Sequence, residues 1–301
     1  MKIAKRTQIG KCGSTCHYNG NVATSPSEPK QKRTQIESPI PQNGPNVMKT
    51  YLLLIYHAAR ASFTRGCRGF CYFVRVVRLV LFDVDGTLVH TGRAGSRAFA
   101  KTFASAFNAP DGVEKIHFPG RTDRNLVREF FGLHGIPATP ENFARFFERY
   151  IFWLDRMVAH SHGGPCEGVP EFLDGLRALP RPPVLGLLTG NIRLGAEIKL
   201  RRYQLWELFA TGAFADDSED RNEIAAAALE RGRRLLGPDL QPEEILVVGD
   251  TPFDIRCGKF IGAKVLAVAT GGATLDELKR HQPDWAVADL TQVSAKDIVE
   301  S

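Results

Sequence analysis

Two aspartates, Asp83 and Asp85, follow a run of apolar residues, and Gly86 comes directly after them. If the run is a buried strand, both carboxylates lie at its end, where they repel each other and are poorly solvated unless a positive charge lies between them. Magnesium suits such a site because it is a hard cation that binds one or two carboxylates together with a substrate phosphate. The pair therefore indicates a metal-assisted reaction of a phosphorylated substrate.

A second acidic pair and a hydroxyl group also follow apolar runs, as Asp83 and Asp85 do. Asp250 and Asp254 follow another apolar run, and parallel strands that lie side by side would bring them next to Asp83. Residues 189–191, Thr-Gly-Asn, follow a third apolar run and lead directly into a helical pattern. A hydroxyl, free backbone amides and a helix N-terminus together favour the binding of an anion.

The elements that must position these residues form an α/β pattern from residue 78 onward. Near-continuous apolar runs are typical of strands buried on both faces of a parallel sheet. Their alternation with helical patterns predicts a doubly wound, Rossmann-like parallel sheet. We expect strands at 79–84, 183–189, 244–249 and 264–269, weaker ones near 208–213 and 285–288, and helices at 192–204, 222–236, 253–261 and 274–280.

The interval 93–165 interrupts this alternation and contains no convincing strand. Its helical patterns, with Phe on their apolar faces, lie at 96–108, 123–134 and 141–159. We therefore expect a helical domain inserted into a core that consists of 78–92 and 166–301. The insert leaves the sheet at the carboxyl end of the first strand, where ligands bind in open α/β sheets, so it is placed to cover the site.

Three motifs occur in the order and at the spacing of a known family. They are Leu81-Phe82-Asp83-Val84-Asp85-Gly86-Thr87-Leu88, Leu188-Thr189-Gly190-Asn191 and Val248-Gly249-Asp250-Thr251-Pro252-Phe253-Asp254. Over residues 78–290 the sequence resembles the haloacid dehalogenase-like hydrolase superfamily, and within it the branch similar to phosphoglycolate phosphatase. The insert at 93–165 resembles the helical cap of that superfamily.

The resemblance implies a Mg2+-dependent phosphatase that works through an aspartyl-phosphate intermediate. Asp83 would attack the phosphorus of a phosphomonoester, and Asp85 would protonate the leaving alcohol and then activate water. The metal would be held by Asp83, the backbone carbonyl of Asp85 and Asp250, with Asp254 positioning the ion or its waters. The phosphoryl group would be held by Thr189 and by the amides of Gly190 and Asn191.

The superfamily also places a cation, usually Lys, against the nucleophile and the phosphate, and two residues compete for this role. Arg221 opens the helical pattern before the strand at 244–249, close to the carboxyl edge of the sheet. Lys199 lies about two turns into the helix that follows Asn191, roughly 12 Å from the start of that helix. Geometry therefore favours Arg221, although Lys199 has the residue type that the family more often uses.

We expect substrate choice to depend on the cap. The loop 118–123 separates two helical patterns with Pro-Gly and presents Arg121. Arg121 is predicted to meet the non-phosphate end of the substrate, such as a carboxylate, through paired hydrogen bonds. A surface position beside a helix cap at Asp123 fits the same sequence equally well.

The leading substrate is 2-phosphoglycolate, and the expected partner is a small phosphorylated metabolite, with neither nucleic acid nor membrane. Asp85 argues against a dehalogenase, which needs no acid for a leaving alcohol. A sugar phosphomutase similar to β-phosphoglucomutase stays an alternative, because the choice depends on cap closure and on the access of water. The enzyme is expected in the cytoplasm as a monomer or homodimer.

The net charge of +6 is divided unevenly along the 301 residues. Residues 1–78 carry 13 Lys and Arg against 2 Asp and Glu, whereas 79–301 carry 26 against 31. The composition predicts a basic, disordered leader over 1–77. An internal secretory signal after Met48, an organellar transit peptide and a downstream translation start are all compatible with it, and we favour the last. A nucleic-acid- or membrane-binding protein driven by the leader is the alternative of another class.

Overall fold

The computed structural model describes residues 76–301, all of which belong to one structural unit. The predicted leader, 1–77, lies outside the described residues except for its last two. Of these, Val77 is buried in the core, and its amide donates a hydrogen bond to the carbonyl of Val299 at 3.0 Å. The prediction of a disordered leader is therefore wrong for its last two residues, which belong to the folded core.

Six parallel strands form the central sheet in the order β5-β4-β1-β6-β7-β8, which confirms the predicted α/β class. They are β1 (Leu79–Phe82), β4 (Val184–Leu188), β5 (Thr211–Ala213), β6 (Ile245–Gly249), β7 (Lys264–Val268) and β8 (Trp285–Val287). All four residues of β1 are buried, because this strand lies between β4 and β6 and is covered on both faces. Every predicted strand is present, with bounds shifted by a few residues.

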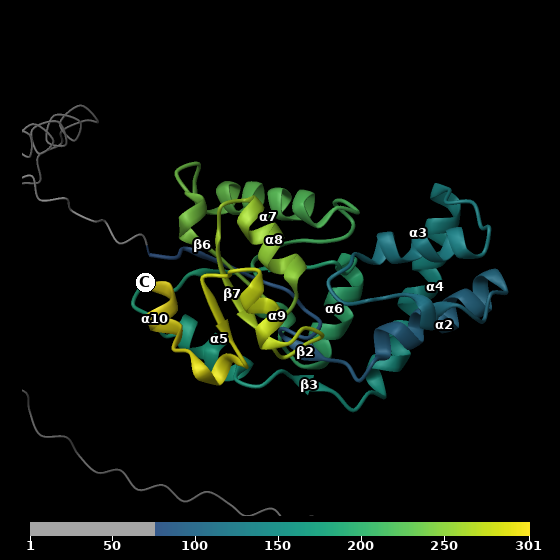
Figure 1. Ribbon diagram of the computed structural model, residues 1–301, viewed down its shortest axis with the longest axis horizontal. Helices are drawn as coiled ribbons and strands as arrows, with labels where there is room; N and C mark the ends of the chain where they lie inside the picture. The colour runs from purple at the N-terminus through teal and green to yellow at the C-terminus, as the bar shows by residue number, and fades with distance from the viewer. Residues whose placement is uncertain (1–75) are drawn as a thin grey trace, which may run out of the picture. The chain divides into compact units, whose positions relative to one another are not determined.

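Helices cover both faces of the sheet (Figure 1). They are α5 (Val169–Arg177), α6 (Arg193–Arg202), α7 (Arg221–Leu236), α8 (Pro252–Phe260), α9 (Leu275–Arg280) and α10 (Ala295–Val299). Alternate residues of a strand point to opposite faces. Accordingly, Leu79 and Leu81 pack with α7 and α8, whereas Val80 and Phe82 pack with α5, α6 and α10. The sequence did not predict α5 and α10.

Three helices, α2 (Ala94–Phe107), α3 (Asp123–Leu133) and α4 (Pro140–Ala159), form the cap between β1 and β4. The side chains of Thr122 and Thr139 cap α3 and α4 by accepting a hydrogen bond from a backbone amide. Phenylalanines from all three helices form the cap core, in which the rings of Phe103 and Phe130 stack with their centroids 3.5 Å apart. These helices therefore share one hydrophobic cluster, which Ile192 and Ala215 from the rest of the chain join.

The two chain connections between the core and the cap pair with each other. β2 (Val89–His90) and β3 (Gly164–Pro165) form a two-stranded antiparallel sheet. The prediction of no strand within 93–165 is therefore wrong at the last two residues of that interval. Two-residue strands are too short to produce a detectable alternation of apolar and polar residues. In the described part of the chain no helix is long and apolar enough to cross a membrane.

Candidate active site

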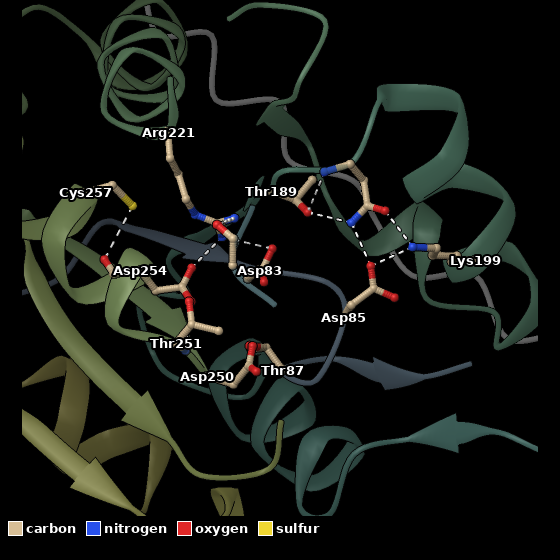
Figure 2. Close-up of polar contacts among 12 residues, drawn as sticks. Asp83, Asp85, Thr87, Thr189, Lys199, Arg221, Asp250, Thr251, Asp254 and Cys257 are labelled. Carbon is tan, nitrogen blue, oxygen red and sulfur yellow. Dashed lines mark hydrogen bonds and ion pairs between the residues drawn. The ribbon is translucent and has the colours of Figure 1, made fainter. Parts of the chain in front are cut away.

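The site lies at the carboxyl ends of three adjacent strands. Asp83 follows β1, Thr189 follows β4 and Asp250 follows β6, and β1 lies between the other two. Parallel neighbours end at the same edge of a sheet, so side chains far apart in the sequence meet there (Figure 2). These residues line a cavity of about 370 Å3 together with residues of the cap.

Three buried carboxylates form the centre of the site. Asp83, Asp250 and Asp254 each offer an oxygen, and these oxygens all lie within 4.8 Å of one another. Burial raises the pKa of Asp83 to about 6, although Arg221 opposes this change. Burial, followed by the charges of Asp254 and Asp83, also raises the pKa of Asp250 well above its ordinary value. A donor set of hard oxygens whose mutual repulsion a cation would relieve fits a divalent metal ion such as magnesium.

The backbone approaches Asp250 so closely that only glycine fits beside it. A Cβ at Gly86, whose φ is +84°, would lie 2.6 Å from Oδ2 of Asp250, and a Cβ at Gly271 would overlap the same oxygen. The hydroxyl of Thr87 donates to Oδ1 of Asp250 at 3.0 Å, and the amide of Gly272 donates to Oδ2 at 3.2 Å. Asp250 is therefore held in one position within the carboxylate cluster.

Arg221, the first residue of α7, lies on one side of this cluster. Its Nη2 is 3.1 Å from Oδ1 of Asp83 and 2.5 Å from Oδ1 of Asp254, and the side chain is 7% exposed. The other oxygen of Asp254 accepts hydrogen bonds from the amide and hydroxyl of Thr251. Arg221 Nε is buried and has no hydrogen-bond partner within residues 76–301.

Lys199 lies on the other side of the site, contrary to the expectation that its place in the helix would keep it away. Its Nζ is 2.6 Å from Oδ2 of Asp85 and 2.6 Å from Oδ1 of Asn191. Helical side chains point toward the N-terminus of their helix, so an extended Lys reaches back over the two turns that separate it from Asn191. The two cations therefore do not compete for one position: Arg221 contacts Asp83, and Lys199 contacts Asp85 (Figure 2).

The residues at 189–191 bind one another as well as the cap. The amide nitrogen and the side-chain Nδ2 of Asn191 both donate to the hydroxyl of Thr189, at 3.3 and 2.8 Å, and Nδ2 also donates to Oδ2 of Asp85 at 2.9 Å. The carbonyl of Gly190 accepts a hydrogen bond from the amide of Asp123 at 2.7 Å. Sequence reasoning expected the Asn191 amide at a phosphate and missed the network that its side chain forms.

The cap supplies the remaining walls of the cavity, among them Phe99, Phe118 and Tyr150. Arg121 also lines the cavity, and its guanidinium forms an ion pair with Glu129 and hydrogen bonds with Asn125. Its contact with a substrate stays a prediction.

Arg93 is a cavity residue that sequence reasoning missed. It is exposed, it has a φ of 64°, and its side chain has no hydrogen bond or ion pair with any residue that the structure describes. A left-handed backbone conformation is uncommon for a residue other than glycine and occurs frequently at functional sites. The sequence carried no signal for it beyond its position ten residues after Asp83.

Comparison with known proteins agrees with this geometry. Residues 80–268 match the family model described as haloacid dehalogenase-like hydrolase. The chain is 28% identical over 224 residues to pyrophosphatase PpaX of Halalkalibacterium halodurans, an alignment that covers 71% of this chain and 94% of the relative. It is 31% identical over 214 residues to phosphoglycolate phosphatase 1 of Pseudomonas aeruginosa, with 66% and 72% of the two chains covered.

Solved structures share the fold. The crystal structure of a predicted phosphatase from Clostridium acetobutylicum superposes with a TM-score of 0.58 at 16% identity, covering 75% of this chain and all of the other. The family match spans more than half of the chain and contains Asp83, Thr189 and Asp250 in the arrangement described above. The chain therefore belongs to the haloacid dehalogenase-like hydrolases.

Proposed function

We propose that the protein is a magnesium-dependent phosphatase that hydrolyses a small phosphomonoester through an aspartyl-phosphate intermediate on Asp83. The observation that carries this proposal is the placement of two aspartates within one cavity. Asp83 belongs to the carboxylate cluster and contacts Arg221, while Asp85 lies two residues further on and is bound by Lys199 and Asn191. A nucleophile and a separate acid are what such a two-step displacement requires.

The metal would be held by Asp83, Asp250 and the backbone carbonyl of Asp85. Asp254 accepts three hydrogen bonds, one on Oδ1 from the Arg221 guanidinium and two on Oδ2 from Thr251, and we assign it the role of positioning the ion or its waters. When bound, Mg2+ would neutralise charge on the phosphoryl oxygens.

The protein groups would then divide the remaining tasks. Asp83 attacks phosphorus, the bond to the leaving oxygen breaks, and Asp85 gives its proton to that oxygen. Asp85 next accepts a proton from the water that attacks the aspartyl phosphate, which returns both residues to their starting states. Arg221 and the hydroxyl of Thr189, which both line the cavity, would bind the transferring phosphoryl group.

The substrate is proposed to be small and to carry a second anionic group, with 2-phosphoglycolate as the leading choice. A cavity of about 370 Å3 with arginines in its wall supports this choice, as does the relative named phosphoglycolate phosphatase. Inorganic pyrophosphate is the second candidate, because its second phosphate is itself an anionic group and other relatives are named pyrophosphatase. Neither the mutase nor the leader-driven binding protein is favoured by these relatives.

The test is phosphate release from a panel of phosphate esters and pyrophosphate, with Mg2+ or with EDTA. We expect release by the wild type that requires Mg2+ and disappears in Asp83→Asn, a substitution that keeps the shape of the side chain. Asp297→Asn, which changes an exposed acid on α10, is the matched control and should leave release unchanged. Equal inactivity of the wild type and Asp83→Asn on every compound would contradict the proposal. Interconversion of sugar phosphates with little release would instead favour the mutase.

A further inference from the structure

Lys199 is a buried cation whose contacts are separate from those of the nucleophile. Its side chain is 4% exposed, and its Nζ bonds to Oδ2 of Asp85 and to Oδ1 of Asn191. Arg221 contacts Asp83 and Asp254, and Lys199 contacts neither of them within the described chain. Figure 2 shows the two cations on opposite sides of the site. Because Arg221 is already proposed to bind the transferring phosphoryl group, Lys199 is not needed as a second cation for that purpose.

The bonds to Asp85 distinguish its two carboxylate oxygens. Oδ2 accepts from Lys199 at 2.6 Å and from the side chain of Asn191 at 2.9 Å. Oδ1 has no hydrogen bond with any residue in 76–301, so it is the oxygen left to exchange a proton with a ligand. Because the Asp85 side chain is 43% exposed, packing alone does not fix its orientation.

The cap closes over the Lys199 ammonium. A Cβ placed on Gly95 of α2 would lie 3.6 Å from Nζ, and the same Cβ would lie 3.9 Å from the hydroxyl of Tyr150 on α4. The ammonium is thus enclosed between the loop after β4, Asp85 and two cap helices. This enclosure keeps water from replacing the Lys199–Asp85 bond.

We propose that Lys199 is a positioning residue that orients Asp85 so that Oδ1 faces the leaving-group oxygen. This inference rests on the proposed phosphatase function. In the first step the bond between phosphorus and the leaving oxygen breaks, the bond to Asp83 forms, and the proton on Oδ1 of Asp85 moves to the leaving oxygen. Lys199 takes no part in the exchange of bonds, and its effect on the reaction is transmitted through Asp85.

Such a role affects esters according to the basicity of their leaving groups. A departing alkoxide is strongly basic and needs a proton, whereas p-nitrophenolate is a weak base and leaves without one. The constant kcat/KM reports the steps up to the formation of the aspartyl phosphate, so it isolates the transfer in which Asp85 acts as an acid. A residue that binds the phosphoryl group, or that only supports the fold, would affect both kinds of ester alike.

The experiment measures kcat/KM of the full chain with Mg2+ for 2-phosphoglycolate, or the alkyl phosphate that ranks first in the panel above, and for p-nitrophenyl phosphate. In Lys199→Met we expect the value for the alkyl ester to fall by roughly 100-fold, a typical contribution of a general acid. The value for the aryl ester should change little, which also shows that the variant is folded. Lys199→Arg, which keeps the charge, should recover part of the loss, and Lys101→Met on the exposed surface of α2 should lose nothing.

A second comparison tests whether Lys199 acts through Asp85. Asp85→Asn should show the same selective loss for the alkyl ester, and adding Lys199→Met to Asp85→Asn should cause no further loss. Equal losses for both esters, no loss for either, or full additivity of the two substitutions would overturn the inference and leave the phosphatase proposal intact. A wild type without Mg2+-dependent release from either ester would overturn both.

Discussion

Asp123 of the cap and Ile192 of the core are joined by a hydrogen bond, in which the amide of Ile192 donates to Oδ2 of Asp123 at 2.8 Å. The amide of Asp123 donates in turn to the carbonyl of Gly190 at 2.7 Å. The first residue of α3 therefore binds both ends of the loop that carries Asn191. Through this pair of bonds the cap holds the loop whose Asn191 side chain contacts both Lys199 and Asp85.

The carboxyl group of Asp123 makes folding depend on pH. Burial raises its pKa to about 7, although Lys199 opposes this change, and the charges of Asp85 and Asp216 raise it further. Between its ordinary pKa of 3.8 and about 7, the folded chain keeps a proton that the unfolded chain has lost. The contribution of Asp123 to the free energy of unfolding therefore falls as the pH rises through this window.

Asp123→Asn removes this ionisation and keeps an oxygen that accepts from Ile192. We expect the variant to gain stability over the wild type as the pH rises from 4 to 7, by up to a few kcal/mol at about 1.4 kcal/mol per pKa unit. Urea unfolding at several pH values measures the difference. Asp276→Asn, an exposed acid in the first turn of α9, should show no such trend. If the free energies of unfolding of the variant and the wild type differ by the same amount at every pH, the raised pKa of Asp123 is contradicted.

Magnesium should stabilise the protein through the carboxylate cluster. An ion that binds only the folded chain raises the free energy of unfolding according to its concentration and dissociation constant. We expect Mg2+ to raise the thermal midpoint of the wild type, and to raise it much less in Asp250→Asn, which loses a charged ligand. Asp297→Asn and sodium chloride of equal ionic strength are the controls. An equal rise in Asp250→Asn would show that Mg2+ binds elsewhere.

Gly86 should tolerate no side chain. Gly86→Ala places a Cβ 2.6 Å from Oδ2 of Asp250 and forces a residue with a Cβ to adopt a φ of +84°. We expect the backbone conformation alone to lower the free energy of unfolding by about 1–3 kcal/mol. Phosphate release should be lost as well, because the Cβ displaces Asp250. Gly132→Ala in α3, where a Cβ meets nothing within 4 Å, is the control and should stabilise by about 0.5–1 kcal/mol. Normal activity in Gly86→Ala would contradict the close approach.

The meeting of Asp83, Asp250 and Thr189 could be predicted because the order of strands in an α/β sheet brings their carboxyl ends to one edge. The helices of the cap could be predicted because each is long enough for a periodic pattern. Both inferences use local patterns together with a general rule of chain topology, and neither requires knowledge of which side chains touch.

Contacts that depend on side-chain direction or on docking of the cap could not be predicted in this way. Lys199 was placed by the rise of the helix alone, which neglects the backward direction and the length of its side chain. Asp123 carried only the signal of an acid near the start of a helix, and its bonds to the loop at 190–192 exist only when cap and core pack together. The pairing of β2 with β3 depends likewise on contacts between distant segments.

Two of the arginines that line the cavity, Arg93 and Arg121, should determine how well a substrate with a second anionic group binds. Arg93 has no partner among the described residues, whereas Arg121 is already paired with Glu129. A charge-assisted hydrogen bond contributes about 1.5–3 kcal/mol, which corresponds to a change in KM of about 10- to 100-fold. We therefore expect Arg93→Ala to raise the KM for 2-phosphoglycolate strongly and Arg121→Ala to raise it less.

Neither substitution should change the KM for p-nitrophenyl phosphate, because its neutral ring offers no carboxylate to an arginine. Steady-state kinetics on both esters checks this, with Arg97→Ala as a control, since Arg97 is an exposed residue of α2 outside the cavity wall. Arginines that only hold the cap in place would raise KM for both esters together. In that case the selectivity for an anionic substrate would have to come from the phosphate-binding side of the site, where Arg221 and Asp83 lie.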